Sequence, residues 1–317
     1  MKTPIAVIVY NRPSFTKRLF QILEALQPAN LFIIADGPKA GDAEDEHRCR
    51  EVRKVFDHIP WECQVARDFA DINLGCGKRP ATGIGWVFEH VDRAIILEDD
   101  CIPNLSFFRF CEELLDRYAD DERIMQINGN NFQFGNRRTE DSYYFSNLSI
   151  CWGWATWRRA WRYHDMALAA WPSLKETSWL ADRVEHPLAV RYWSRQFDRA
   201  YQSRGDIDFW DYQWSFAIWV QNGLTIMPSE TLVTNIGCGP LGTHTKSANQ
   251  KTANLKAREL SFPLRHPDLM IRHREADRYF IETVVVPKSM PRSKKKKFPV
   301  FSKYASAVYK RLFNSLT

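Results

Sequence analysis

The sequence predicts an α/β fold in which a mostly parallel central sheet carries helices on both faces. Two observations support this prediction. Apolar runs of strand length alternate with segments of helical periodicity from residue 4 to residue 127, which is typical of βαβ units. Three of the apolar runs also end directly in polar residues, at the position where open α/β sheets bind ligands. With 317 residues the chain can bury the core of one large domain or of two small ones.

The first expected elements are a strand over residues 4–9 and a helix that Pro13 is suited to open. Apolar residues then recur at helical spacing as far as Leu26. The second strand covers residues 31–35 and ends at the turn residue Asp36. The alternation continues with a helix over 44–56, a strand over 61–66, a helix over 77–90, a strand over 94–97, a helix over 106–118 and a short strand over 124–127.

The alternation of strands and helices stops near residue 128. Residues 129–141 are expected to form a loop, and ten of the twelve tryptophans then follow between Trp152 and Trp219. Three of them, Trp154, Trp157 and Trp161, recur at helical spacing. We expect a boundary that divides one domain into two halves, followed by a tail: residues 1–128, 129–287 and 288–317.

The composition argues against several classes of protein. Hydrophobic content of 44% and charged content of 26% are ordinary for a globular enzyme. The seven cysteines include no Cys-x-x-Cys pair, so they indicate neither a zinc site nor a disulfide framework and favour the reducing cytoplasm. No apolar run reaches the roughly 18 residues of a membrane span, and the N-terminal run is too short for a signal peptide. The net charge of +6 is concentrated near the C-terminus, so no nucleic-acid partner is expected.

The C-terminal tail combines a lysine run with an amphipathic pattern. Lys294-Lys295-Lys296-Lys297 is followed by apolar residues that share one helical face: Phe301, Tyr304, Ala305, Val308, Leu312 and Leu316. This combination predicts peripheral attachment to the anionic inner face of the cell membrane, to which each basic residue near the surface contributes about 1 kcal/mol. The alternative interpretation is a flexible, solvated tail.

The most informative segment is the acidic triplet Glu98-Asp99-Asp100, which follows the apolar run 94–97 directly. Three adjacent carboxylates repel one another, so a positive group is expected beside them, most simply a divalent cation with oxygen ligands. The alternative is a solvated acidic turn. Asn11, Arg12 and Asp36 follow two other strands, and one ligand spanning the shared sheet edge would explain all three polar strand ends. Chance is the competing explanation, because every strand must end in a turn.

Four segments occur in the order and approximate spacing of a known family: Tyr10-Asn11-Arg12-Pro13, Ile34-Ala35-Asp36-Gly37, Asn73-Leu74-Gly75-Cys76-Gly77-Lys78-Arg79 and Leu97-Glu98-Asp99-Asp100. The chain thereby resembles the nucleotide-sugar glycosyltransferases of GT-A fold, both the bacterial family-2-like enzymes and N-acetylglucosaminyltransferase I and its relatives. Three later segments continue the resemblance: Cys151-Trp152-Gly153-Trp154-Ala155-Thr156-Trp157, Phe209-Trp210-Asp211, and Asn235-Ile236-Gly237-Cys238-Gly239 leading to Thr243-His244-Thr245. Together they cover roughly residues 4 to 246.

The resemblance implies that residues 1–128 bind the nucleotide sugar. It implies that Asp100 ligates Mn²⁺ or Mg²⁺, that His244 completes the metal shell or touches the diphosphate, and that Glu98 and Asp99 hold ribose hydroxyls or metal-bound water. Asp36 would accept the uracil N–H, although an Asp before Gly is also a common turn residue. The remaining residues expected to contact the donor are Tyr10, Asn11, Arg12, Lys78 and Arg79, the last two because they begin a helix. Gly75 and Gly77 are more simply a turn.

The resemblance places acceptor binding and catalysis in residues 129–287, with Asp211 as the general base. Its aromatic neighbours would partly desolvate Asp211 and raise its pKa, which suits a base. Asp211 is alternatively a structural partner of an arginine, and Asp206 and Asp208 compete for the role. The family often has two adjacent acids where this chain has Asp211-Tyr212. Trp152, Gly153 and Trp210 are expected to form the acceptor side, because tryptophan rings stack on sugars; the competing interpretation is that the tryptophans are core.

The sequence therefore predicts a metal-dependent glycosyltransferase of the hexosyl- or N-acetylhexosaminyltransferase class. It would move a sugar from a nucleotide diphosphate sugar, in particular a UDP-sugar, to a hydroxyl of a lipid-linked or surface-polysaccharide precursor, with inversion. The expected place of action is the cytoplasmic face of the membrane. Two alternatives are a nucleotidyltransferase acting on sugar phosphates, although the turn after the first strand lacks a Gly-rich form, and a non-enzymatic membrane-surface binding protein.

Overall fold

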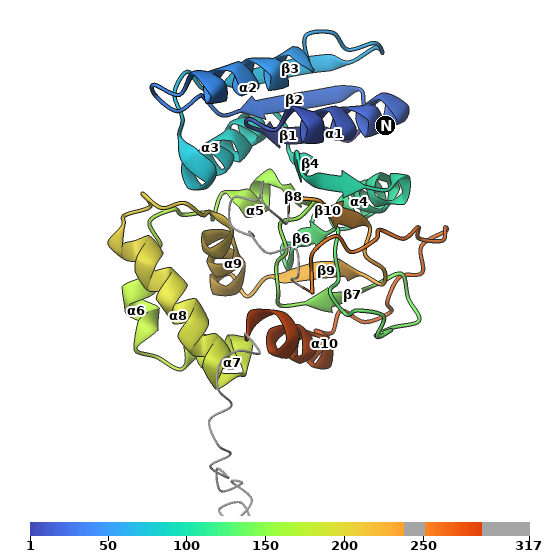
Figure 1. Cartoon of the computed structure of the whole chain (residues 1–317). Coiled ribbons are helices and arrows are strands. Elements are labelled where there is room, and N and C mark those ends of the chain that lie inside the picture. The colour runs from blue at the N-terminus through green and yellow to red at the C-terminus, as the bar shows by residue number, and fades with distance from the viewer. Residues whose placement is uncertain (238–250, 287–317) are drawn as a thin grey trace, which may run out of the picture.

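Four parallel strands form the first half of the central sheet. The computed structural model describes residues 1–237 and 251–286. The four strands are β1 (Ile5–Val9), β2 (Asn30–Ala35), β3 (Gln64–Phe69) and β4 (Arg93–Glu98), in the order β3-β2-β1-β4. β1 lies between β2 and β4, so the residues that follow these three strands meet at one edge of the sheet (Figure 1).

The second half of the sheet is mixed. It contains β6 (Ile124–Asn128), β7 (Tyr143–Ser146), β8 (Trp154–Trp157) and β9 (Leu224–Pro228), and the full order is β3-β2-β1-β4-β8-β6-β9-β7. β8 is antiparallel to both β4 and β6, and β7 is antiparallel to β9, whereas β6 and β9 are parallel. Parallel pairs remain the majority, and strands from both sides of residue 128 share this one sheet.

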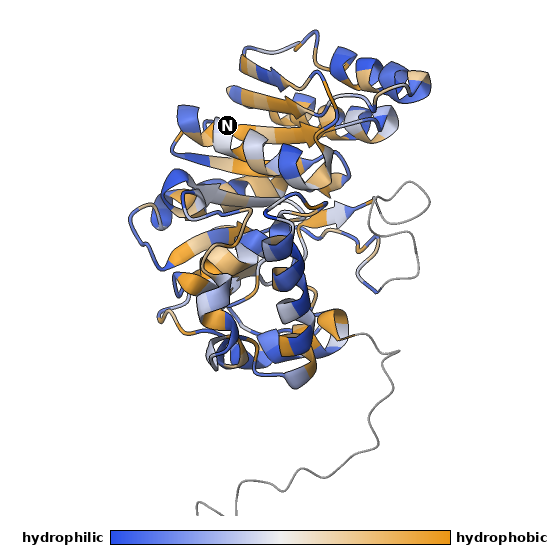
Figure 2. Cartoon of the chain, turned by 90° about the vertical axis from the view of Figure 1, so that its left-hand side faces the viewer, coloured by the Kyte–Doolittle hydropathy of each residue, from blue (hydrophilic) through white to orange (hydrophobic). Residues whose placement is uncertain are grey.

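Helices cover both faces of the sheet, because the side chains of each strand alternate between them. Ile5, Val7 and Val9 pack into one buried cluster, and Ala6 and Ile8 into the other. The first cluster lies under α1 (Pro13–Leu26), α2 (Ala43–Lys54) and α4 (Leu105–Arg117), and the second under α3 (Gly75–His90), α8 (Pro187–Gln202) and α9 (Asp211–Val220). Figure 2 shows the strands mainly in the hydrophobic colour, with hydrophilic residues on the surrounding helices. The predicted α/β class, with a mostly parallel sheet and helices on both faces, is confirmed.

The remaining elements are short. They are β5 (Cys101–Pro103), β10 (Val233–Asn235), α5 (Arg158–Trp161), α6 (Trp171–Lys175), α7 (Trp179–Val184), α10 (Arg274–Phe280) and the π-helix η1 (Ile281–Val285). β5 and β10 form a separate two-stranded antiparallel sheet immediately after the acidic triplet. Asn104 then caps α4, because its side chain accepts the backbone N–H of Phe107 at 3.0 Å.

The third strand begins three residues later than the sequence predicts. Trp61, expected in the strand, instead lies in the preceding bend and fastens it to the first βα unit. Its Nε1 donates to the carbonyl of Pro28 at 2.9 Å, and its ring packs on Phe20 with a centroid distance of 5.7 Å. The strand pairs with β2 only from Gln64 onward. In the sequence, a large apolar residue such as Trp61 that anchors a loop looks the same as the first residue of a strand, which explains the shifted boundary.

The helical interpretation of Trp154, Trp157 and Trp161 is wrong. Residues 154–157 form β8, and only Trp161 lies in a helix, α5. All three side chains are buried, in agreement with the alternative that they belong to the core. Because β8 passes directly into α5, tryptophans from a strand and a helix stand at intervals in the sequence that are also typical of one helix.

Among the helices of residues 1–237 and 251–286, none has the length and apolar character needed to cross a membrane.

Candidate active site

A cavity of about 570 Å³ opens at the carboxyl ends of β1 and β4. Six of the residues expected from the sequence to act on substrate line it, and they come from both halves of the chain: Arg12, Glu98, Asp100, Trp152, Trp210 and Asp211. The strand order reverses between β1 and β4, so the cavity at their carboxyl ends occupies the position at which open sheets bind ligands.

Arg12 supplies the positive charge that the acidic triplet requires. Its Nε donates to Asp99 Oδ2 at 3.3 Å and its Nη2 bonds Asp99 Oδ1, while Nη1 donates to Asp100 Oδ2 at 3.0 Å. The two carboxylates raise the pKa of Arg12 against the opposing effect of burial, so the guanidinium stays charged. The alternative of a simple solvated acidic turn does not describe this triplet, because Asp99 and Asp100 are buried.

The acidity of Glu98 is altered by its surroundings. Burial, and then the negative charge of Asp100, raise the pKa of Glu98 to about 8. Its carboxyl group lines the cavity. Burial also raises the pKa of Asp99, although Arg12 opposes this shift. Glu98 therefore binds a proton at the cavity more readily than an ordinary glutamate does.

The last residue of β10 and the two residues after it hold Asp100 in place. The side-chain amide of Asn235 donates to Asp100 Oδ1 at 3.3 Å, and the backbone N–H of Ile236 donates to the Asp100 carbonyl at 2.9 Å. Gly237 follows, and its own N–H is fixed by Asn235 Oδ1 at 2.9 Å. A Cβ at position 237 would lie 2.0 Å from Asp100 Oδ2, so only glycine fits beside this carboxylate.

Tyr10 and Asn11 bind an acidic residue of α2, outside the cavity lining. The Tyr10 hydroxyl donates to Asp45 Oδ2 at 2.5 Å, and the Asn11 amide donates to Asp45 Oδ1 at 2.5 Å. Lys39 adds its backbone N–H to Asp45 Oδ2 at 2.7 Å. Hydrogen bonding by Tyr10, the backbone of Lys39 and Asn11 lowers the pKa of Asp45 against the opposing effect of burial. These contacts fix the turn that carries Arg12.

Asp36 organises the loop that leads into α3. Its carboxylate accepts the backbone N–H groups of Gly37 at 2.8 Å, Leu74 at 2.9 Å and Gly75 at 3.0 Å. The Asn73 amide adds a fourth hydrogen bond at 3.1 Å. The geometry corresponds to the turn role that the sequence left as an alternative for Asp36. Burial raises the pKa of Asp36, and the backbone hydrogen bonds oppose that shift.

Lys78 and Arg79 have different environments in α3. Lys78 is exposed, whereas Arg79 is buried and 4% exposed. The Arg79 guanidinium bonds Asp68 Oδ2 at 2.8 Å and the carbonyl oxygen of Ala35 at 3.2 Å. In this structure the guanidinium of Arg79 is therefore used to join α3 to β2 and β3.

Asp211 is the first residue of α9 and faces the cavity from the second half of the chain. It is exposed, so its aromatic neighbours do not bury it as the sequence predicts; Phe209, Trp210 and Trp214 are the buried aromatic residues of this segment. The segment before it packs against α3, since a Cβ at Gly77 would lie 1.9 Å from the carbonyl oxygen of Ile207. This close approach sets the position of Asp211 relative to the acidic triplet.

The three residues expected on the acceptor side have distinct environments. Trp152 is partly exposed and its ring meets Phe132 edge to face at 5.3 Å. Gly153 has a φ of +73°, and its carbonyl accepts the N–H of Gly129 at 2.8 Å, so the residue shapes the backbone of this loop. Trp210 is 4% exposed and stacks on Trp154 at 5.7 Å, which makes most of its ring part of the core.

The far wall of the cavity is apolar, and apart from Trp152 its residues were not expected from the sequence. Phe132 and Trp152 face residues from the C-terminal end of the described chain, namely Phe280, Val284 and Val285. No sequence pattern joins Phe132 to η1, because about 150 residues separate them and only the tertiary fold brings them together. Tyr192, Arg199 and Asn235 also line the cavity.

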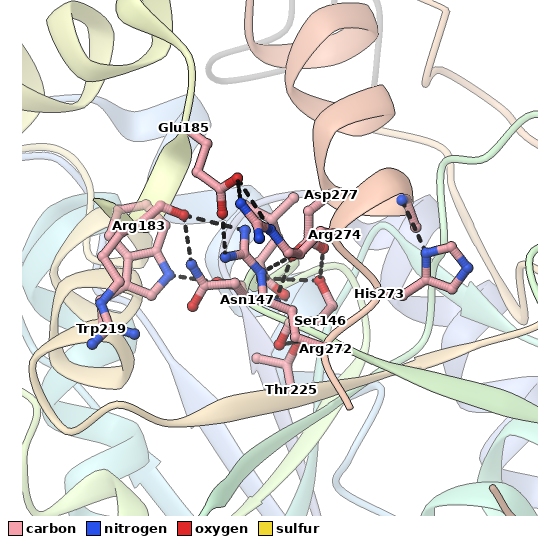
Figure 3. Close-up of polar contacts among 12 residues, drawn as sticks. Ser146, Asn147, Arg183, Glu185, Trp219, Thr225, Arg272, His273, Arg274 and Asp277 are labelled. Atoms are coloured by element: carbon pink, nitrogen blue, oxygen red, sulfur yellow. Dashed lines mark hydrogen bonds and ion pairs between the residues drawn. The ribbon is translucent and has the colours of Figure 1, made fainter. Parts of the chain in front are cut away.

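A buried polar network holds α10, which leads into this apolar wall (Figure 3). Asp277 accepts the Ser146 hydroxyl at 2.5 Å, the Asn147 N–H at 3.1 Å and Arg272 Nε at 2.6 Å. Arg272 also pairs with Glu185 at 2.9 Å. The network ties α10 to the end of β7 and to the loop after α7, so it fixes one wall of the cavity from outside.

The residues around the triplet fit a divalent cation of the magnesium or manganese type. Such ions take oxygen ligands, commonly one or two carboxylates together with substrate phosphates. Glu98 and Asp100 offer those carboxylates at the cavity, although Asp100 Oδ2 already accepts Arg12. Within the described ranges no group of three or more His, Cys, Asp or Glu side chains is arranged to hold a metal by itself. His244 and the basic tail 288–317 lie outside the described residues.

The comparisons with known proteins give weak likenesses in structure alone. No model of a known protein family and no curated protein matches the chain. A UDP-glucose pyrophosphorylase complexed with UDP-glucose is similar with a TM-score of 0.32 and 10% identity, over 51% of this chain and 78% of that one. Mouse xyloside xylosyltransferase 1 in its apo form is similar with a TM-score of 0.31 and 12% identity, over 69% of this chain and 81% of that one. A protein assigned as a glucose-1-phosphate thymidylyltransferase from Bacillus anthracis, in complex with a sucrose, is similar with a TM-score of 0.30 and 12% identity, over 67% of this chain and 99% of that one. TM-scores this low assign neither a family nor an activity to the chain.

Proposed function

We propose that the chain is a GT-A-type glycosyltransferase that moves a sugar from a nucleotide diphosphate sugar, in particular a UDP-sugar, to a hydroxyl group of a lipid-linked or surface-polysaccharide precursor. One observation carries this proposal. The cavity has Arg12, Glu98 and Asp100 on the side of the parallel strands and Asp211 on the other side. The same cavity is therefore bordered by groups that could neutralise a leaving diphosphate and by a carboxylate that could act as base for an incoming hydroxyl.

The donor would bind on the side of the parallel strands. Arg12 offers a guanidinium, whose fork geometry suits phosphate oxygens, and the carboxylates of Glu98 and Asp100 would hold Mn²⁺ or Mg²⁺. Bound there, the ion would supply Lewis-acid stabilisation of the diphosphate. Lys78 is exposed near the start of α3, and this position supports a contact of its ammonium group with the nucleotide.

In the chemical step, Asp211 would act as the general base that accepts the proton of the acceptor hydroxyl. The acceptor oxygen forms a bond to the anomeric carbon, the bond from that carbon to the diphosphate oxygen breaks, and the hydroxyl proton passes to the Asp211 carboxylate. Direct displacement of this kind inverts the anomeric centre. Because Asp211 is exposed in the free protein, binding of the acceptor is what would desolvate it.

The acceptor would bind on the tryptophan side. Trp152 offers a partly exposed ring for a sugar, and the wall of Phe132, Phe280, Val284 and Val285 offers an apolar surface next to it. That combination supports an acceptor with both a sugar and an apolar part, as in a lipid-linked precursor. We further propose that the basic tail attaches the enzyme to the inner face of the cell membrane. Deleting residues 288–317 should then abolish binding to anionic liposomes, and undiminished binding would reject the attachment.

Calorimetry with UDP, in the presence and absence of Mn²⁺, tests the donor site. Binding that requires Mn²⁺ and is lost in Asp100→Ala supports the proposal, and unchanged activity of purified Asp100→Ala would refute the site. A panel of nucleotide sugars should then reveal one whose Mn²⁺-dependent hydrolysis is fastest. Release of pyrophosphate from a nucleoside triphosphate and a sugar phosphate would instead identify a nucleotidyltransferase.

A further inference from the structure

Arg12 occupies the position beside Asp100 that a diphosphate-bound cation would need. Its Nη1 lies 3.0 Å from Asp100 Oδ2, and the side chains of Arg12 and Asp100 are only 17% and 12% exposed. A dication and a guanidinium at the same carboxylate oxygen repel each other strongly in a poorly hydrated site. The two positive groups therefore compete for Asp100.

The hydrogen bonds of Arg12 to the two carboxylates are unequal. Asp99 receives two, from Nε and Nη2, and its side chain is 1% exposed, whereas Asp100 receives one, from Nη1. The backbone of Arg12 is also fixed, because its carbonyl accepts the N–H groups of Phe15 at 3.1 Å and Thr16 at 3.0 Å. Because the guanidinium is planar and rigid, Nη1 leaves Asp100 only when the whole group tilts, and the two hydrogen bonds to Asp99 anchor the group during that tilt.

Asp100 itself is held independently of Arg12. Asn235 binds its Oδ1 at 3.3 Å, and Gly237 packs against it without a side chain. Release of Arg12 Nη1 would thus leave the carboxylate in place with its Oδ2 available. A bound diphosphate would give the released Nη1 a new acceptor, since phosphate oxygens accept guanidinium hydrogen bonds.

We propose that Arg12 is an exchangeable counterion of Asp100: it neutralises the carboxylate in the free protein and yields Oδ2 to a divalent cation that arrives with a diphosphate. This inference rests on the proposed donor site. It makes metal binding depend on the nucleotide, because the cation alone must displace Arg12 without offering it another acceptor. By linkage, Mn²⁺ and UDP then strengthen each other's binding by the same factor.

The test measures the affinity for Mn²⁺ alone, by calorimetry and by the spin-resonance signal of free Mn²⁺, without nucleotide. Arg12→Gln should bind Mn²⁺ at least ten-fold more tightly than the wild type, and the added Asp100→Asn substitution should remove the gain. Arg199→Gln is the matched control, because it removes a positive charge from the same cavity at a residue whose ion-pair partner, Asp208, is 3.8 Å away. Its Mn²⁺ affinity should change less than three-fold.

Equal or weaker Mn²⁺ binding by folded Arg12→Gln would overturn the proposal, as would a gain of equal size in Arg199→Gln. If Arg12→Gln does not fold, the double variant Arg12→Gln/Asp99→Asn, which removes both members of the stronger pair, is measured by the same criteria. The enhancement of Mn²⁺ binding by UDP should also be smaller in Arg12→Gln than in the wild type. If the wild type does not bind UDP in the presence of Mn²⁺, the proposed function is rejected. The counterion role of Arg12 is judged separately, from the Mn²⁺ affinities of wild type and Arg12→Gln measured without nucleotide.

Discussion

Gly237 and Asp100 are in direct contact, although 137 positions separate them in the sequence. A Cβ at Gly237 would lie 2.0 Å from Asp100 Oδ2 and 2.8 Å from its Cγ, closer than any real Cβ approaches such atoms. The glycine of the later loop therefore sets the position of the acidic strand end. The contact explains why a small residue stands at the rim of the cavity.

Gly237→Ala should displace Asp100 and weaken Mn²⁺-dependent UDP binding at least ten-fold, with a loss of stability of about 1–3 kcal/mol from the overpacking. Calorimetry and urea unfolding measure the two effects. Gly85→Ala is the control, since a Cβ there would meet only Trp161 Nε1, at 3.9 Å, and alanine raises helix stability by up to about 1 kcal/mol. Wild-type UDP binding by Gly237→Ala would contradict the prediction that Gly237 holds Asp100 in the position that binding requires.

Asp211→Asn should leave the affinity for the donor within two-fold and reduce the transfer rate by about 10²- to 10⁴-fold, because the amide cannot accept the proton. Single-turnover assays with the identified sugar donor check this. Asp208→Asn is the comparison, because Asp208 is an exposed neighbour that lines the same cavity. A larger loss in Asp208→Asn would assign the base to Asp208 instead, and equal loss of donor binding and transfer in Asp211→Asn would mean a structural role.

Asp277→Ala should destabilise the protein by about 3–5 kcal/mol, because it leaves Arg272 and the Ser146 hydroxyl without their buried acceptor. Arg274→Gln removes an exposed ion pair with Glu185 in the same network and should cost less than about 1 kcal/mol. Urea unfolding of both variants checks the difference. Similar losses in the two variants would contradict the distinction between the buried and exposed parts of the network.

His164 should make the protein less stable in mild acid. Burial lowers its pKa to about 4, and its ring stacks on Trp161 at 4.2 Å. The unfolded chain, with a histidine pKa of about 6.5, binds more protons between these values, so stability falls as the pH drops from about 6.5 toward 4, by at most about 3 kcal/mol. Unfolding of His164→Phe over this range should show a flatter pH dependence than the wild type, and parallel curves would contradict the prediction.

The sequence predicted the parts of the site that lie at strand ends. Arg12 and the acidic triplet follow strands that pair in parallel, so their proximity follows from the βαβ pattern. The apolar wall from η1 and the contact of Gly237 with Asp100 were not predictable, because each joins segments that only the completed tertiary fold brings together. The role of Arg79 was obscured for another reason: a charge at a helix start suits a ligand and a buried ion pair equally well.

The position of β8 has a consequence for folding. It joins the sheet between β4 and β6 and is antiparallel to both, so the edge of β4 remains without a neighbour until residue 157 has been added to the chain. An unpaired strand edge invites intermolecular pairing. During synthesis the nascent chain passes through a stage in which four parallel strands present this open edge, and chaperone binding at that stage would protect it from aggregation.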